Sequence, residues 1–203
     1  SDLTQSAQIA YRLKEAGIGT FFRPGELTSL DIDARGLQRL VAEGVVEQVS
    51  RGLYRLTDAE PTADYTLAGV CARVPHAVVC LLSALKVYGI GTHVPAEVWI
   101  GIPHKARVPR IATARVRVVR FSGAAWTYGV VDTSFEGVPA HITTPARTLV
   151  DGFRFERLIG REAAREALRD ALKRRLVTVD ALYRVLDVLS SRRLRTVLEA
   201  SLT

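Results

Sequence analysis

The stretch from residue 31 to residue 56 constrains the fold most, because it combines a capped helix with a hairpin. Asp33 is placed to cap a helix over residues 34–43, and Gly44 is placed to end that helix in a left-handed conformation. One face of this predicted helix is apolar and comprises Leu37, Leu40 and Val41. The opposite face comprises Arg35, Gln38, Arg39 and Ala42. The helix therefore packs on one side and leaves polar side chains on the other.

Two short apolar runs follow this helix, over residues 45–49 and 53–56, and both favour β-strands. The three residues between them end in Gly52, which permits a tight turn. We therefore expect a β-hairpin with Arg51 at its tip.

Helices are also expected before this segment. Apolar spacing predicts a helix over residues 3–16, and Pro24 suits the first turn of a brief helix that runs to about Leu30. Two helices thus flank a short turn at residues 31–33, with a hairpin behind them. This order predicts a winged helix-turn-helix over residues 1–58.

The exposed side chains of this predicted domain suit DNA. Arginine can hold guanine, and glutamine can hold adenine, with paired hydrogen bonds in the major groove, so Arg35, Gln38 and Arg39 are candidate base readers. Arg51 in the wing could contact a phosphate or the minor groove. Any amphipathic helix could expose such residues, however, and helix-turn-helix folds also serve as protein docking modules.

The net charge of +7 is unevenly distributed along the chain. Residues 1–56 hold seven basic and seven acidic side chains, so the predicted DNA-binding domain has no excess charge. Residues 104–120 hold six cations and no acid: Lys105, Arg107, Arg110, Arg115, Arg117 and Arg120. We refer to these residues as the basic stretch. It is either a solvated strand face and loop, or a surface that binds a phosphate or a protein partner.

A polar, acidic segment at residues 57–64 predicts a domain boundary near residue 60. The second domain, residues 61–203, is predicted to be α+β, with a small mixed sheet and a helical C-terminus from about residue 145. Its first helices are expected over residues 65–74 and 82–88. Its strands are expected over residues 97–102, 116–121, 128–135 and 138–143. From Arg161 onward about three helices are expected, with breaks at residues 177–178 and 190–191.

The sequence gives no support for a metal, a cofactor or a membrane span. The two cysteines, Cys71 and Cys80, fall in an apolar segment, which favours free thiols and a reducing cytoplasm. The four histidines are scattered without the spacing of metal ligands. No run of 18 apolar residues is present.

Catalysis also lacks a recognisable motif, so we expect no catalytic residues. The residues that could take part are Ser83, His104, Asp132, His141 and Asp151. None stands in a known phosphate-binding, nucleophile-elbow or zinc-protease pattern. The spacing of Arg147 and Asp151 instead predicts an ion pair on one helix.

Four stretches carry a resemblance to a known family: residues 36–44, 51–54, 82–90 and 143–151. In this order, and with the strand at residues 98–103 between the last two, they resemble the AbiEi-type antitoxins of type IV toxin–antitoxin systems. The resemblance implies a protein that represses its own operon through the winged helix and neutralises a nucleotidyltransferase-like toxin. It leaves open whether the toxin is bound directly, and whether the protein self-associates cooperatively on DNA.

The partners expected from this resemblance are operator DNA and the cognate toxin, with the basic stretch as the candidate toxin-binding surface. The alternative is a stand-alone winged-helix transcription factor whose second domain senses a ligand or forms a dimer.

Overall fold

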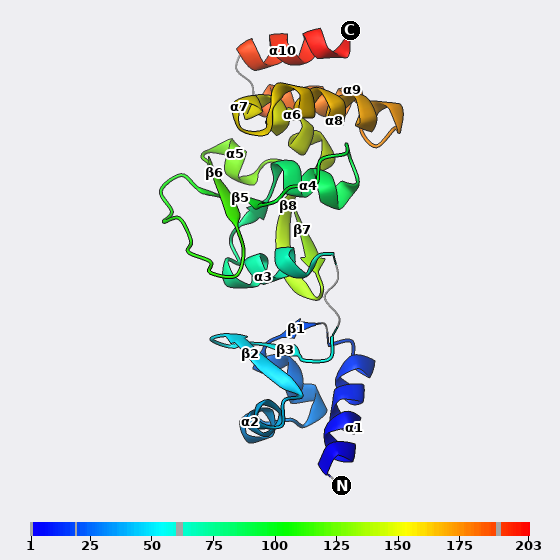
Figure 1. Ribbon diagram of the computed structural model, residues 1–203. Helices are drawn as coiled ribbons and strands as arrows, with labels where there is room; N and C mark the ends of the chain where they lie inside the picture. The colour runs from blue at the N-terminus through cyan, green and yellow to red at the C-terminus, as the bar shows by residue number, and fades with distance from the viewer. Residues whose placement is uncertain (1, 19, 60–62, 190–191) are drawn as a thin grey trace. The chain divides into compact units, whose positions relative to one another are not determined.

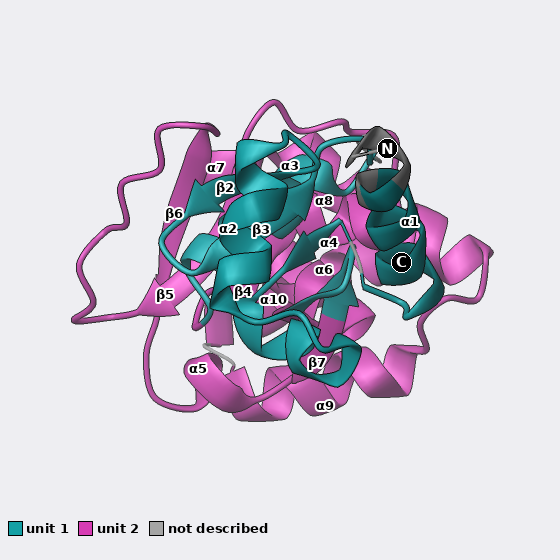
Figure 2. Ribbon diagram, turned by 90° about the horizontal axis from the view of Figure 1, so that it is seen from below, with its two compact units in different colours: residues 1–75, 134–139 teal, residues 76–133, 140–203 magenta. Residues whose placement is uncertain are grey.

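The computed structural model describes residues 2–18, 20–59, 63–189 and 192–203, and it divides into two compact units. The first unit comprises residues 1–75 and 134–139, and the second comprises residues 76–133 and 140–203 (Figure 2). The helix after the predicted boundary, α3 (Tyr65–Arg73), thus groups with the first unit. The predicted boundary near residue 60 falls largely, and the predicted break at residues 190–191 entirely, outside the described residues. Domains 1–58 and 61–203 therefore stay a prediction.

The first unit has the element order of a winged helix-turn-helix. Its helices are α1 (Asp2–Glu15), the 3-10 helix η1 (Pro24–Leu30) and α2 (Ala34–Ala42), followed by α3. Its strands are β1 (Phe21–Phe22), β2 (Val46–Ser50) and β3 (Leu53–Leu56), in the order β1-β3-β2 (Figure 1). The brief helix expected from Pro24 is a 3-10 helix, and the hairpin is the predicted wing.

Apolar side chains from all of these elements except α3 form one core. Leu13 from α1, Leu27 from η1 and Leu40 from α2 are almost fully buried in it, together with Val46 and Leu56 of the hairpin. Burial of each such side chain stabilises the folded state by about 1.5–3 kcal/mol. The helices that flank the turn are thus fixed to the wing by a shared core.

The five-stranded sheet is mixed, as predicted. Its strands are β4 (Val78–Val79), β5 (Val98–Pro103), β6 (Val116–Phe121), β7 (Val130–Phe135) and β8 (Val138–Thr143). They lie in the order β6-β5-β4-β8-β7. β4 pairs in parallel with β8 and antiparallel with β5, and β5 pairs in parallel with β6. The two-residue strand β4 was not predicted, because its apolar neighbours mask so short a pairing.

Helices make up the rest of the second unit. They are α4 (Leu81–Tyr88), α5 (Ala124–Thr127), α6 (Pro145–Arg154), α7 (Glu156–Ile159), α8 (Arg161–Lys173), α9 (Val179–Leu189) and α10 (Arg192–Leu202). α6 is central, because it contacts α4, α8, α9 and α10. The helices from α6 onward gather beyond one end of the sheet (Figure 1). The α+β class and the helical C-terminus are confirmed.

Candidate functional site

Helix α2 begins and ends where its sequence dictates. The Asp33 carboxylate accepts a hydrogen bond from the Gly36 amide at 2.8 Å, which caps the first turn. At the other end, Gly44 has a φ of 73°, and its amide and that of Val45 donate to Val41 and Leu40 carbonyls. This is the Schellman arrangement, in which glycine avoids the steric cost of a left-handed residue. The helix is therefore defined at both termini by local contacts.

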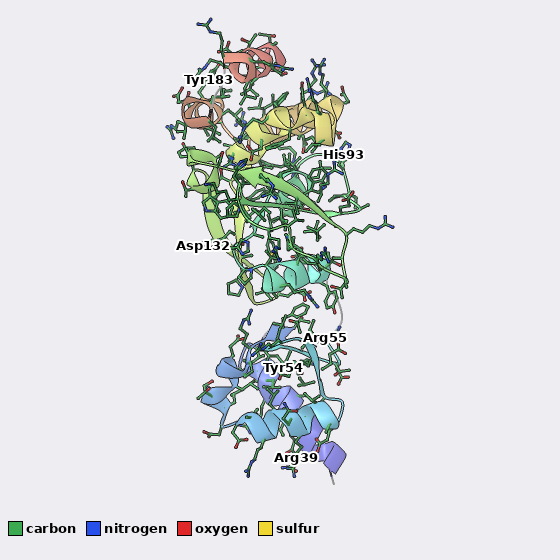
Figure 3. All side chains as sticks on the ribbon, turned by 90° about the vertical axis from the view of Figure 1, so that its left-hand side faces the viewer. Arg39, Tyr54, Arg55, His93, Asp132 and Tyr183 are labelled. Atoms are coloured by element: carbon green, nitrogen blue, oxygen red, sulfur yellow. The ribbon has the colours of Figure 1, made fainter. Side chains whose placement is uncertain are left out.

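The polar face of α2 is free to meet a ligand. Leu37 and Leu40 are buried, whereas Arg35, Gln38 and Arg39 are exposed, as the amphipathic pattern predicts. Arg39 lies at the outer side of α2 in Figure 3 and approaches Glu43 at only 4.0 Å. Such a solvent-exposed pair contributes little to stability, so Arg39 can leave Glu43 to contact DNA. The three side chains form a continuous donor-rich surface on one helix.

The wing places Arg51 at its tip. Gly52 has a φ of 71°, and the ladder between β2 and β3 is irregular between Gln48 and Ser50, so the strands bend into a tight turn. Arg51 is exposed there. A side chain at this position can reach a phosphate or the minor groove without competing with the core.

Sequence reasoning missed a second cation beside the wing. A β-carbon added to Gly52 would lie 4.0 Å from Nη1 of Arg23, so this guanidinium borders the turn. Arg23 is also exposed and donates through Nη2 to the Ala72 carbonyl at 3.4 Å. Arg23 and Gly52 are far apart in sequence, and only the folded chain brings them together.

Arg55 of the wing has a structural contact instead. Its Nη1 donates to the Tyr65 hydroxyl at 2.7 Å, and its Nε lies 3.7 Å from a Glu47 carboxylate oxygen. The guanidinium also lies over the Tyr65 ring, with 5.3 Å between its central carbon and the ring centroid. These partners compete with phosphate for Arg55, so we do not count it among the DNA-facing residues.

All six cations of the basic stretch are exposed, but their contacts differ. Arg120 donates through Nη1 to the carbonyls of His104 and Ala106 at 2.7 and 2.8 Å, and it holds the start of the β5–β6 loop to β6. The central guanidinium carbon of Arg117 lies 5.6 Å from the Trp99 ring centroid. Within the described part of the chain, none of the six forms a salt bridge.

The loop tip is the part of the basic stretch best placed to meet a partner. Arg107 and Arg110 flank Val108 and Pro109, and all four line one open hollow. Val108 is 49% exposed, which leaves an apolar group between two cations. A tip of this kind offers both charge and apolar contact, the usual combination at the edge of a protein interface.

The segment at residues 143–151, which the resemblance singles out, is a buried structural centre. Arg147 donates through Nε to the Asp151 carboxylate at 2.8 Å, and Arg154 donates to the other oxygen at 2.7 Å. Arg147 also donates to the Tyr128 carbonyl and lies over the Phe121 ring at 4.7 Å. Burial raises the pKa of Asp151, although Arg147 and Arg154 oppose the rise. The predicted ion pair on one helix is confirmed.

The residues considered for catalysis serve separate contacts. In the core, the Ser83 hydroxyl accepts a hydrogen bond from the Trp99 amide at 2.8 Å. On an exposed part of the sheet, His141 pairs with Asp132 at 2.8 Å. The His104 carbonyl holds Arg120. Among the described residues, no hydrogen bond or ion pair joins Ser83 to either member of the His141 pair. We identify no assembled nucleophile and base.

Comparisons with known proteins agree with this geometry. A winged helix with a donor-rich helix α2 has the geometry that places such a helix in the major groove of DNA. Residues 11–57 match the family model described as "Transcriptional regulator, AbiEi antitoxin". The resemblance to AbiEi-type antitoxins is thereby confirmed for residues 11–57, which are similar to the regulator domain of that family.

The remaining comparisons concern the whole chain. The crystal structure of the RV2827C protein from Mycobacterium tuberculosis is similar in fold, with a TM-score of 0.55 and 18% identity. The match covers 91% of this chain and 71% of that one. No curated protein matches the chain. Among the described helices, none is long and apolar enough to cross a membrane.

Proposed function

We propose that this protein is the antitoxin of a type IV toxin–antitoxin system and represses its own operon. The observation that carries the proposal is the exposed face of α2, with Arg35, Gln38 and Arg39, next to a wing tipped by Arg51, within a domain of the AbiEi antitoxin class. In this assignment α2 enters the major groove and Arg51 contacts the backbone or the minor groove. The winged helix acts as the DNA-binding domain, residues 1–58.

Toxin neutralisation belongs, in this proposal, to residues 61–203. The basic stretch supports it, because a solvent-facing set of cations with no acid in the same segment attracts an acidic partner and guides its approach. The partner is a nucleotidyltransferase-like toxin in the cytoplasm, and the antitoxin acts by binding rather than catalysis. Arg107 and Arg110 at the loop tip are the contacts with the toxin, and Arg120 holds the loop in place.

The test is co-expression with the product of the adjacent gene, scored for growth, in parallel with operator-binding measurements. Reversal of Arg107 and Arg110 to glutamate should abolish rescue and leave operator affinity at moderate salt close to wild type. A matched control, Arg165→Glu with Arg184→Glu, makes the same charge change at exposed helical positions and should rescue. DNA binding without rescue by the wild type would instead support a stand-alone transcription factor.

A further inference from the structure

A groove opens between the end of α6, the short helix α7 and the helices α9 and α10. It has a volume of about 760 Å³, which is within the roughly 300–1,000 Å³ typical of ligand-binding clefts. The four helices lie at the same end of the second unit (Figure 1). The groove is distant in sequence from the winged helix and from the basic stretch, and none of the roles assigned above uses it.

The groove has an incompletely covered apolar floor. Phe155, Leu189 and Val197 are only partly buried, and Leu158 is 44% exposed although α7 is packed against α8. These side chains come from three different helices and meet at one place. Exposed leucine next to half-buried aromatic and aliphatic groups is typical of surfaces that bind another protein.

Cations from two different helices also line the groove. Arg157 on α7 and Arg193 on α10 both line the groove, both are exposed, and neither forms a salt bridge within the described part of the chain. A third arginine, Arg154, is engaged by Asp151. Among the described lining residues, the single acid is Glu156. The groove therefore combines partly exposed apolar side chains with two arginines that have no salt-bridge partner among the described residues.

Glu156 lines the groove from the first residue of α7. One of its carboxylate oxygens lies 3.6 Å from Arg161, but the other, Oε2, is buried and has no hydrogen-bond partner among the described residues. Buried acceptors in folded proteins are nearly always paired.

We propose that this groove binds an amphipathic, acidic helix of the toxin. A helix can place apolar residues at i, i+3, i+4 and i+7 on the floor while its acidic flanks meet Arg157 and Arg193. A second copy of this chain is a poor source of such a segment, because the chain has a net charge of +7. The inference rests on the proposed antitoxin function only for the identity of the partner, since the chemistry of the groove is independent of it.

The first test uses a synthetic helical peptide with leucine at i, i+3, i+4 and i+7 and glutamate at its flanks, titrated calorimetrically into the full-length protein. Arg157→Glu with Arg193→Glu should weaken binding by at least about tenfold, because like charges then face each other. The matched control Arg165→Glu with Arg184→Glu should bind like wild type. Leu158→Asp, at an exposed position, should weaken binding and leave the fold intact. Equal affinity of the wild type for a polyglutamate peptide of the same length would contradict the proposal that this groove binds an amphipathic helix. Unchanged binding by the Arg157 and Arg193 variant would contradict it as well.

The second test measures toxin rescue and co-purification of the toxin with the same variants. Loss of both with the Arg157 and Arg193 variant, with operator affinity retained, is the expected result. If the wild-type protein binds the peptide through the groove but does not rescue growth in the presence of the toxin, the proposed antitoxin function is contradicted. The groove would then still be a helix-binding site. Full rescue and co-purification by a variant that no longer binds the peptide would show that the toxin docks elsewhere.

Discussion

Arg147 and Asp151 form an ion pair in which both side chains are completely buried, with 2.8 Å between Nε and Oδ2. Asp151 has a second cation, Arg154, whereas Arg147 has no second carboxylate among the described residues. Its Nη2 has no hydrogen-bond partner among the described residues and lies near the Phe121 face. The pair is therefore asymmetric, and the two partners should respond differently to substitution.

Asp151→Leu should destabilise the protein by about 3–5 kcal/mol, because it leaves Arg147 charged and uncompensated in the core. Arg147→Met should cost less, since Asp151 keeps Arg154. The double variant should recover part of the loss, as buried ion pairs replaced by apolar residues often do. Urea unfolding of the three variants measures this, with the exposed Arg165→Met as control. Equal losses in both single variants would contradict the asymmetry.

Single alanine substitutions of Arg35, Gln38 and Arg39 should each lower operator affinity, by about 1–3 kcal/mol for a residue that reads a base. Each loss should be accompanied by relaxed preference at one base pair, because the lost hydrogen bonds were specific. Fluorescence anisotropy with a set of single-base operator variants measures both effects, and Arg165→Ala is the control. Wild-type operator affinity in all three variants, with folding intact, would contradict the assignment of α2 as the helix that reads the bases.

Arg51→Ala should weaken DNA binding uniformly across sequences and lower the slope of log K against log salt by roughly one unit, because one phosphate contact is lost. Arg23→Ala should have a similar effect, since its guanidinium borders the same turn. A salt titration of the two variants provides the measurement. A loss confined to one base pair would indicate direct readout by the wing instead.

Arg120→Ala should free the β5–β6 loop, because its guanidinium holds the His104 and Ala106 carbonyls. The Ala106 amide, which donates to Pro103 at 3.0 Å, is the reporter. Its hydrogen exchange should accelerate on the order of tenfold, as expected for the loss of roughly 1–1.5 kcal/mol of hydrogen bonding. Lys105→Ala removes the same charge and should leave this amide unchanged. Equal acceleration in both would attribute the effect to charge alone.

Asp170 should contribute stability that depends on pH. The Gly91 amide, at 2.8 Å from Oδ2, and Arg174, at 3.0 Å, lower the pKa of this carboxyl from its ordinary value of 3.8. The contribution is therefore present above pH 3.8 and is lost as the pH falls through the lowered folded-state pKa. Wild type should unfold at higher urea than Asp170→Asn at neutral pH, and the gap should close in acid. A constant gap would contradict the assignment.

Most of the fold was accessible from the sequence where local chemistry decides it. The Asp33 cap and Gly44 fixed the bounds of α2, and the apolar alternation of residues 138–143 predicted β8 as observed. The two-residue strand β4 was not accessible, because it exists only through pairing with β5 and β8.

The candidate surfaces were accessible in part. Exposure of Arg35, Gln38 and Arg39 follows from helical periodicity, so the sequence was enough to predict it. The role of Arg120 depends on its contacts with the His104 and Ala106 carbonyls, and that of Arg23 on its position beside the turn at Gly52. These partners are distant in sequence, so no local pattern encodes the contacts. The groove lined by Arg157 and Arg193 depends on the packing of four helices, and charge counting along the chain does not detect it.

The parallel pairing of β4 with β8 joins Val78 to His141. The five-stranded sheet therefore cannot form on a ribosome until that distant strand has been synthesised and has left the exit tunnel. The three strands of the winged helix and its core are complete by residue 56. Because local contacts form faster than distant ones and N-terminal domains fold first during synthesis, the winged helix can fold while the rest is still being synthesised. Under the proposed function, a prematurely terminated chain would then bind the operator without the part proposed to meet the toxin, so that repression would precede toxin neutralisation in time.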